Sequence, residues 1–229
     1  IIITMRLALW GTVIATIIGL VIGLSRCSQN LFLRLVSRAY VELIRNIPPL
    51  VFIFIFYFFL SSQIMPLLGV DMFVHHGSPA AQAVVGVLFA DPSLLANFVS
   101  GVLCLGLFEG AYIAEIVRAG VQSIERGQWE AAKSIGLSRL DVMRFVILPQ
   151  AIQKILPPLA GQFITLIKDS AIVSLISIQE LTFMAMEVAA STTKVFETWI
   201  TVGAMYFGIC FIFAVLFGRL EKRMSASRR

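Results

Sequence analysis

The chain has 229 residues, of which 59 % are hydrophobic and only 14 % are charged, and its formal net charge is +5. Soluble domains are closer to half apolar and a quarter charged, so an aqueous core of this size does not account for the composition. The surplus apolar surface needs a bilayer as its solvent. The composition therefore excludes an ordinary soluble enzyme, and the basic excess gives no reason to expect nucleic acid as a partner, because it falls in the loops between apolar stretches.

Five apolar stretches are long enough to cross a membrane as helices, each within or near the required 17–25 residues. We expect these spans over 4–25, 47–68, 92–118, 156–178 and 198–218. Only helices satisfy their own backbone in lipid, and no alternating strand pattern occurs. The expected fold class is an all-α membrane protein with a single domain over 1–229. The apolar segment 80–90 is too short to span and is interpreted as interfacial or partly re-entrant.

Basic residues cluster after the first span, between the third and fourth, and after the fifth. The positive-inside rule places these segments in the cytoplasm, which predicts an outside N-terminus and a cytoplasmic C-terminus. The sequence begins with Ile1 rather than Met, so we expect further N-terminal residues. The apolar stretch 8–23 leads into arginines instead of a small-residue cleavage site, which does not fit a signal peptide.

Residues suited to metal or nucleophilic chemistry are few. Cys27, Cys104 and Cys210 lie far apart, which favours packing residues over disulfides or a metal site. The only histidines, His75 and His76, are adjacent and lack other ligand types nearby, so we assign no metal and no hydrolase triad. No phosphate-binding Gly-x-x-x-x-Gly-Lys-Ser/Thr loop occurs, so we expect neither ATP hydrolysis nor a cofactor in this chain.

The loop 122–154 lies on the predicted cytoplasmic side and contains the most specific pattern. A helix is expected over 128–135, and Gly136 provides a stop with positive φ. The segment 138–141 offers a serine and an aspartate at capping distance, which begins a second short helix that must end before Pro149. Two short helices that meet at a glycine form a firm elbow, against which a soluble partner can press.

This pattern resembles the EAA loop of ABC importer permeases. The resemblance comprises Glu130, Ala131 and Ala132, then Gly136, and then the run Val-Ile-Leu-Pro at 146–149. Segments 41–50, 110–120 and 156–158, with Lys-Asp-Ser at 168–170, resemble the polar amino-acid branch, so the resemblance covers nearly the whole chain.

The resemblance implies the type I importer permease (MetI-like) fold in a multi-pass protein of the cell membrane. It implies that the elbow is a coupling helix docking on an ATPase, with Glu130, Ala131, Ala132, Gly136 and Leu137 as docking residues. The implied partners are two ATPase subunits that bind ATP and Mg, a second permease copy or paralogue, an extracytoplasmic solute-binding protein, membrane lipid and the amino acid.

The run 108–112 is similar to a variant of acidic amino-acid permeases, which favours glutamate, glutamine or aspartate as the substrate. Basic amino acids remain an alternative class of substrate. A stand-alone secondary transporter is the alternative from another class, but it needs no ATPase dock and usually carries internal repeats, which the sequence lacks. A membrane scaffold is the third alternative, against which charges inside a span argue.

Lys168 and Asp169 lie near mid-depth of the fourth expected span, where a charge costs at least about 2.5–3.5 kcal/mol. Gln162, Thr165 and Asp169 follow helical spacing, so one face of this helix is polar. A lysine and an aspartate complement the carboxylate and ammonium of an amino acid. The resemblance supports a substrate site here. The alternative is a Lys168–Asp169 pair that only orders the helices.

Glu109 and Tyr112 lie one turn apart on the third span, where Glu109 faces either the same cavity or the outer water boundary. Glu115 with Arg118, and likewise Glu42 with Arg45, have the spacing of structural ion pairs. Two proline pairs, at 48–49 and 157–158, are interpreted as opening spans two and four, where a missing N–H costs little.

Overall fold

The computed structural model describes residues 1–70 and 78–226, and all regular secondary structure within this part is helical. His75 and His76 lie outside the described residues. The α-helices are α1 Ile2–Arg26, α2 Leu31–Asn46, α3 Pro49–Ile55, α4 Ser62–Leu67, α6 Pro79–Leu88, α7 Leu95–Gln122, α8 Arg126–Ser134, α9 Arg139–Asp141, α10 Leu148–Asp169, α11 Leu181–Thr192 and α12 Val195–Ala226. Two π-helical turns, Phe56–Ser61 and Val142–Ile147, and two 3-10 turns, Pro92–Leu94 and Ser170–Ile176, join some of them.

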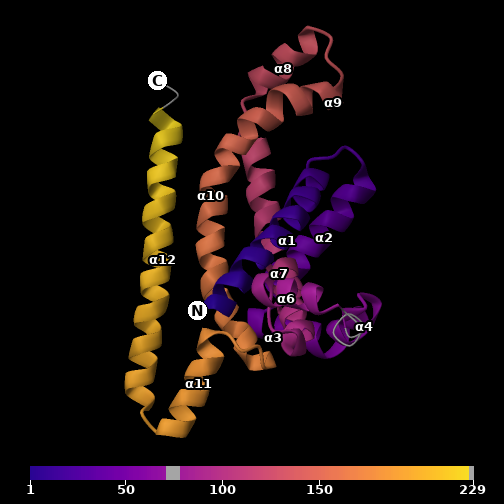
Figure 1. Ribbon diagram of the computed structural model, residues 1–229. Helices are drawn as coiled ribbons and strands as arrows, with labels where there is room; N and C mark the ends of the chain where they lie inside the picture. Colours follow the sequence, from indigo (N-terminus) through magenta and orange to yellow (C-terminus); the bar gives the residue numbers. More distant parts are fainter. Residues whose placement is uncertain (71–77, 227–229) are drawn as a thin grey trace.

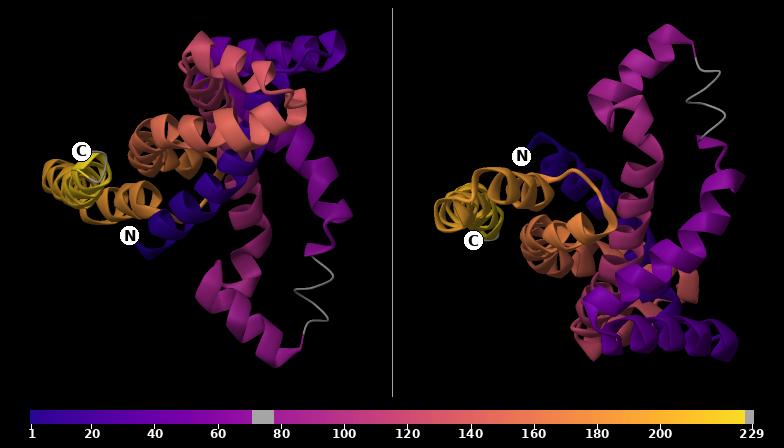
Figure 2. Two further views of the ribbon diagram at one scale, coloured as in Figure 1. Left: turned by 90° about the horizontal axis from the view of Figure 1, so that it is seen from above. Right: turned by 90° about the horizontal axis from the view of Figure 1, so that it is seen from below.

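Five helical stretches are long and apolar enough to cross a membrane, which confirms the expected number of spans. They are Ile2–Arg26, Pro49–Leu67, Pro92–Gln122, Arg139–Ile176 and Val195–Arg223. The short apolar helix α6 stays below spanning length. The elbow of α8 and α9 projects at the same end of the molecule as the last turns of α12, and the turn between α11 and α12 lies at the opposite end (Figure 1). Seen along the bundle, α12 stands at its edge (Figure 2).

The centre of the bundle is the parallel packing of α1 along α7. Small residues allow the two backbones to approach closely, as in other membrane helix pairs. A Cβ on Gly19 would lie 2.4 Å from Ile113 Cγ2, and one on Gly23 would lie 2.7 Å from the Ala114 carbonyl oxygen. The third span, which contains α7, is accordingly the most buried, with 67 % of its apolar window inside the protein, against 6 % for the fifth.

The fourth span differs from the expectation in its use of proline. The second elbow helix does not end before Pro149, because a π-helical turn widens the helix just before the ring and the chain continues into α10. The Gln150 side chain donates a hydrogen bond to the Val146 carbonyl at 2.8 Å, which replaces part of the lost backbone bonding. Pro157 and Pro158 lie inside α10 and do not open the span, whereas Pro48 and Pro49 do begin α3.

The hairpin of α11 and α12 is fastened to α1 by a buried polar group that the sequence did not single out. Glu180 caps α11 by accepting a hydrogen bond from the Phe183 amide at 2.9 Å, and it accepts another from the Tyr206 hydroxyl at 2.7 Å. Thr4 accepts from the Leu181 amide at 3.0 Å and donates to Glu180 at 3.5 Å. Burial raises the pKa of the Glu180 carboxyl, and these hydrogen bonds to the carboxylate oppose that rise.

Gly23→Ala tests the close contact of α1 with α7. The added methyl group meets the Ala114 carbonyl and Val117, so we expect a loss of about 1–3 kcal/mol in stability, typical of overpacking. The measurement is the melting temperature of the detergent-solubilised protein. Gly203→Ala is the matched control, because no atom lies within 4 Å of a Cβ there. Equal melting temperatures for the two variants would show that the contact is looser than described.

Candidate functional site

The elbow on the predicted cytoplasmic side is built as its sequence indicates. After α8 the backbone turns at Gly136 with φ of +83°, which confirms the predicted positive φ. Ser138 then caps the next helix by accepting from the Asp141 amide at 3.3 Å. These two local features fix a sharp projecting corner between α8 and α9 (Figure 1).

The residues predicted to dock a partner divide between the surface and the interior of this elbow. Glu130, Ala131 and Gly136 are exposed. Ala132 is buried, and Leu137 is partly buried and packs against the same apolar cluster. Ala132 therefore holds the elbow on the helices beneath it and does not offer a contact surface.

Two apolar side chains at the tip of the elbow were missed by the sequence analysis. Ile135 is 77 % exposed and Leu140 is 74 % exposed, and they flank the turn at Gly136 on either side. The sequence did contain a signal for them, because large apolar residues are unusual in a segment otherwise rich in charge. These two side chains give the tip of the elbow an apolar surface that none of the described residues covers.

A second set of candidate side chains lies inside the bundle, around Glu109. Glu109 sits near the middle of α7 and is wholly buried, which places it away from the outer water boundary. Its Oε2 accepts a hydrogen bond from Gln162 of α10, whereas its buried Oε1 has no partner in the described part of the chain. An unsatisfied buried carboxylate oxygen is costly, and either a proton shared with Asp169 or a donor from outside the chain would offset that cost.

Tyr112 and Asp169 complete this cluster together with a residue that was not predicted for it. Asp169 lies close enough to Glu109 for the two carboxyl groups to interact directly. Tyr112, one turn along α7, is partly exposed, and the Arg45 guanidinium lies over its ring with Cζ 5.4 Å from the centroid. The structure thus brings together Glu109, Tyr112, Gln162 and Asp169, and adds Arg45 of α2.

Lys168 and Thr165 do not join the cluster. Consecutive residues of a helix point about 100° apart, so Lys168 cannot share the direction of Asp169. Lys168 is exposed, and no ion pair links it to Asp169 or to any other described carboxylate. Thr165 is partly buried and its hydroxyl has no hydrogen bond among the described residues. The predicted structural pair Lys168–Asp169 is therefore not formed.

The two ion pairs expected from helical spacing have different outcomes. Glu115 pairs with Arg118 as predicted, and it also binds Arg26, which fastens the end of α1 to α7. The Glu42–Arg45 pair is wrong, because Glu42 lies 3.9 Å from Arg38 instead. Arg45 is drawn to the aromatic ring of Tyr112, a partner that spacing along α2 does not reveal.

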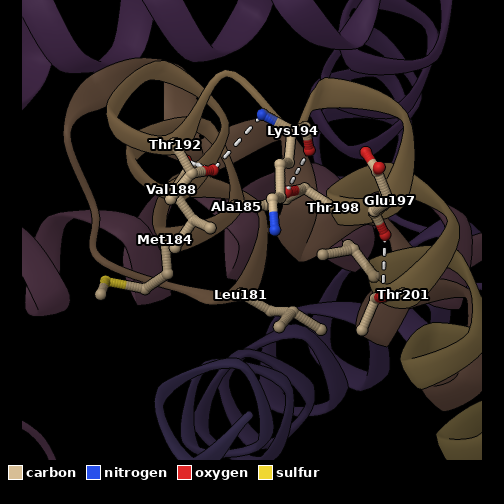
Figure 3. Close-up of a pocket in the computed structure, with 10 residues that line it drawn as sticks. Leu181, Met184, Ala185, Val188, Thr192, Lys194, Glu197, Thr198 and Thr201 are labelled. Atoms are coloured by element: carbon tan, nitrogen blue, oxygen red, sulfur yellow. Dashed lines mark hydrogen bonds between the residues drawn. The ribbon is translucent and has the colours of Figure 1, made fainter.

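Two grooves lie away from this cluster, and both are largely apolar. One, of about 370 Å³, separates α11 from α12, and the hydroxyls of Thr198 and Thr201 bond to backbone carbonyls at its wall (Figure 3). The other, of about 610 Å³, separates α10 from α12. Neither groove gathers converging polar groups as the Glu109 cluster does. No set of three or more metal-ligating side chains comes together within residues 1–70 and 78–226.

Comparison with known proteins places the chain in a family. The sequence profile of the family described as "binding-protein-dependent transport system inner membrane component" matches residues 15–226. A probable glutamine ABC transporter permease of Bacillus subtilis, GlnM, is 33 % identical over 211 residues, which cover 92 % of this chain and 85 % of the relative. The glutamine transport system permease GlnP of Escherichia coli K12 is 33 % identical over 223 residues, covering 96 % and 90 %.

Solved structures agree with this assignment. A crystal structure of an amino acid ABC transporter with histidines superposes with a TM-score of 0.77 at 34 % identity, covering 97 % of this chain and 91 % of the other. The MetNI methionine ABC transporter, in an inward-facing form, shares the fold with a TM-score of 0.63 at 18 % identity, covering 96 % and 90 %. The chain belongs to the inner-membrane components of binding-protein-dependent transport systems and is a multi-pass permease subunit of an amino-acid ABC importer.

Proposed function

We propose that the amino acid crosses the membrane past the Glu109 cluster, and that it is glutamine or a closely related acidic amino acid. The observation that carries the proposal is the buried Oε1 of Glu109, which has no partner in the described chain and lies beside Gln162 and Asp169. Two carboxyl groups suit the α-ammonium of the substrate, and Gln162 suits an amide or carboxylate. The glutamine permeases among the relatives support this choice of substrate.

A basic amino acid is the second candidate. A paired Glu109 and Asp169 would also accept a cationic side chain, and the described cluster contains only one cation, Arg45. Uptake of labelled glutamine into proteoliposomes, with unlabelled glutamine, glutamate, aspartate and arginine as competitors, separates the candidates. Absence of glutamine uptake, in proteoliposomes that take up labelled arginine in a parallel assay, would exchange the first candidate for the second.

The ATP that drives uptake is bound, with Mg, by two partner ATPase subunits that dock on the elbow of α8 and α9. A second permease copy or paralogue completes the pathway, and an extracytoplasmic solute-binding protein delivers the substrate. Support comes from the buried cluster beneath the elbow, in which Ala132 of α8 packs with Val117 of α7 and Ala151 of α10. The same two helices carry Glu109 and Asp169, so movement of the elbow reaches the substrate site directly.

Glu109→Gln tests the site. It keeps the shape of the side chain and a partner for Gln162 but removes the charge that meets the ammonium. We expect glutamine uptake at a fixed low concentration to fall about tenfold to a hundredfold, the loss of about 1.5–3 kcal/mol for a hydrogen bond to a charged group. Glu187→Gln, at an exposed position of α11, is the matched control. Undiminished uptake by the Glu109 variant would remove this residue from the site.

Ile135→Ser and Leu140→Ser test the elbow. Both residues are exposed, so the permease folds, and the loss of apolar contact weakens the complex with the ATPase. We expect co-purification of the ATPase and substrate-stimulated ATP hydrolysis to decrease together. Leu31→Ser is the control, because Leu31 is a comparably apolar and 57 % exposed residue of α2, outside the elbow. Full ATPase recovery with both elbow variants would exclude the tip as the docking surface.

A further inference from the structure

We propose that Arg45 is a specificity-determining residue of the importer and that its guanidinium binds a carboxylate group of the translocated amino acid at the mouth of the Glu109 cluster. The proposal rests on the substrate site proposed above. It assigns the carboxylate end of the substrate to α2, the helix between the first two spans, for which the sequence indicated only a structural ion pair.

The position of Arg45 follows from its contacts. It lies in the last turn of α2, and its Cζ is 5.4 Å from the centroid of the Tyr112 ring. Arg45 is exposed, Tyr112 is partly exposed and Glu109 is fully buried. These three residues therefore form a path from the protein surface into its interior, and the guanidinium lies at the surface end of that path.

The Arg45 guanidinium forms no ion pair with any of the described residues. Arg26 and Arg118 share Glu115, and Arg38 pairs with Glu42, but no carboxylate of the described residues lies within ion-pair distance of Arg45. A guanidinium held over an aromatic face keeps the N–H donors at its edge available. Those donors form a rigid fork that matches a carboxylate in two parallel hydrogen bonds.

The charges around Tyr112 complement a zwitterion. Glu109, Asp169 and Arg45 all lie within electrostatic reach of the Tyr112 side chain, two acidic groups and one basic group. An amino acid whose ammonium meets the carboxyl groups thus has a cation beside it for its carboxylate. Lys168, the other cation considered for this role, points about 100° away from Asp169 around α10 and forms no ion pair with any described residue.

The carboxylate that Arg45 binds belongs either to the α-carbon or to an acidic side chain, and four ligands distinguish these sources. They are glutamine, glutamate, and the two amines made by removing the α-carboxylate from each. Binding to the permease–ATPase complex in lipid nanodiscs, without the solute-binding protein, is followed by saturation-transfer NMR at ligand concentrations up to the millimolar range. The absence of any binding to the wild-type complex overturns both this proposal and the substrate site.

Arg45→Gln is the decisive variant. We expect it to weaken glutamine binding about tenfold to a hundredfold, the range for a charge-assisted hydrogen bond, and to leave the amine derived from glutamine unaffected. If the side-chain carboxylate is the partner, glutamate and its amine both weaken while glutamine does not. Arg45→Lys retains part of the affinity, because it keeps the charge but loses the fork.

Matched variants separate this role from a structural one. Arg38→Gln removes an exposed arginine about two turns away on the same helix, so it retains binding. Melting temperatures of all variants show that the fold is intact. The proposal is overturned if Arg45→Gln weakens the binding of all four ligands equally. It is also overturned if Lys168→Gln weakens the binding of glutamine and Arg45→Gln does not. Unchanged binding of every ligand by Glu109→Gln overturns the substrate site itself, whereas selective weakening of glutamine by Arg45→Gln in the same experiment still supports Arg45 as the carboxylate-binding residue.

Discussion

The close parallel contact of α1 with α7 is the constraint on which the rest of the structure depends. In lipid there is no hydrophobic force between helices, so their association relies on packing and on polar links. Gly19 and Gly23 give the packing, and the ion pair of Arg26 with Glu115 gives the polar link at one end. Because α7 is fixed in this way, Glu109 is held fully buried in its middle and cannot turn to water for a partner.

The elbow depends on the same arrangement. Its buried Ala132 belongs to an apolar cluster that also contains Val117 and Ile155, residues of α7 and α10. A force on the exposed tip therefore acts on packed side chains, which resist deformation, and moves the helices as units. The fold thus places the elbow and the polar cluster at different points of two shared helices, α7 and α10.

Hydropathy was sufficient for the spans, because lipid leaves helices as the only solution for a long apolar stretch. Hydropathy did not reveal α2, because its arginines make that segment too polar to register as a span. It also did not reveal the π-helical turn that precedes Pro149 and lets the helix continue. The local spacing rule succeeded for Glu115 and Arg118 and failed for Arg45. Tyr112 is distant in sequence, and only the packing of α2 on α7 brings its ring to the guanidinium.

The bond between Thr4 and Glu180 has a consequence for how the protein is made. Thr4 belongs to the span Ile2–Arg26, which leaves the ribosome well before Glu180, whereas Glu180 follows the span Arg139–Ile176 and Tyr206, which also binds Glu180, lies in Val195–Arg223. A buried carboxyl of this kind reaches its partners only when both ends of the chain are in the bilayer. Membrane insertion can proceed span by span, but the bundle closes late, when the last hairpin returns to the first helix.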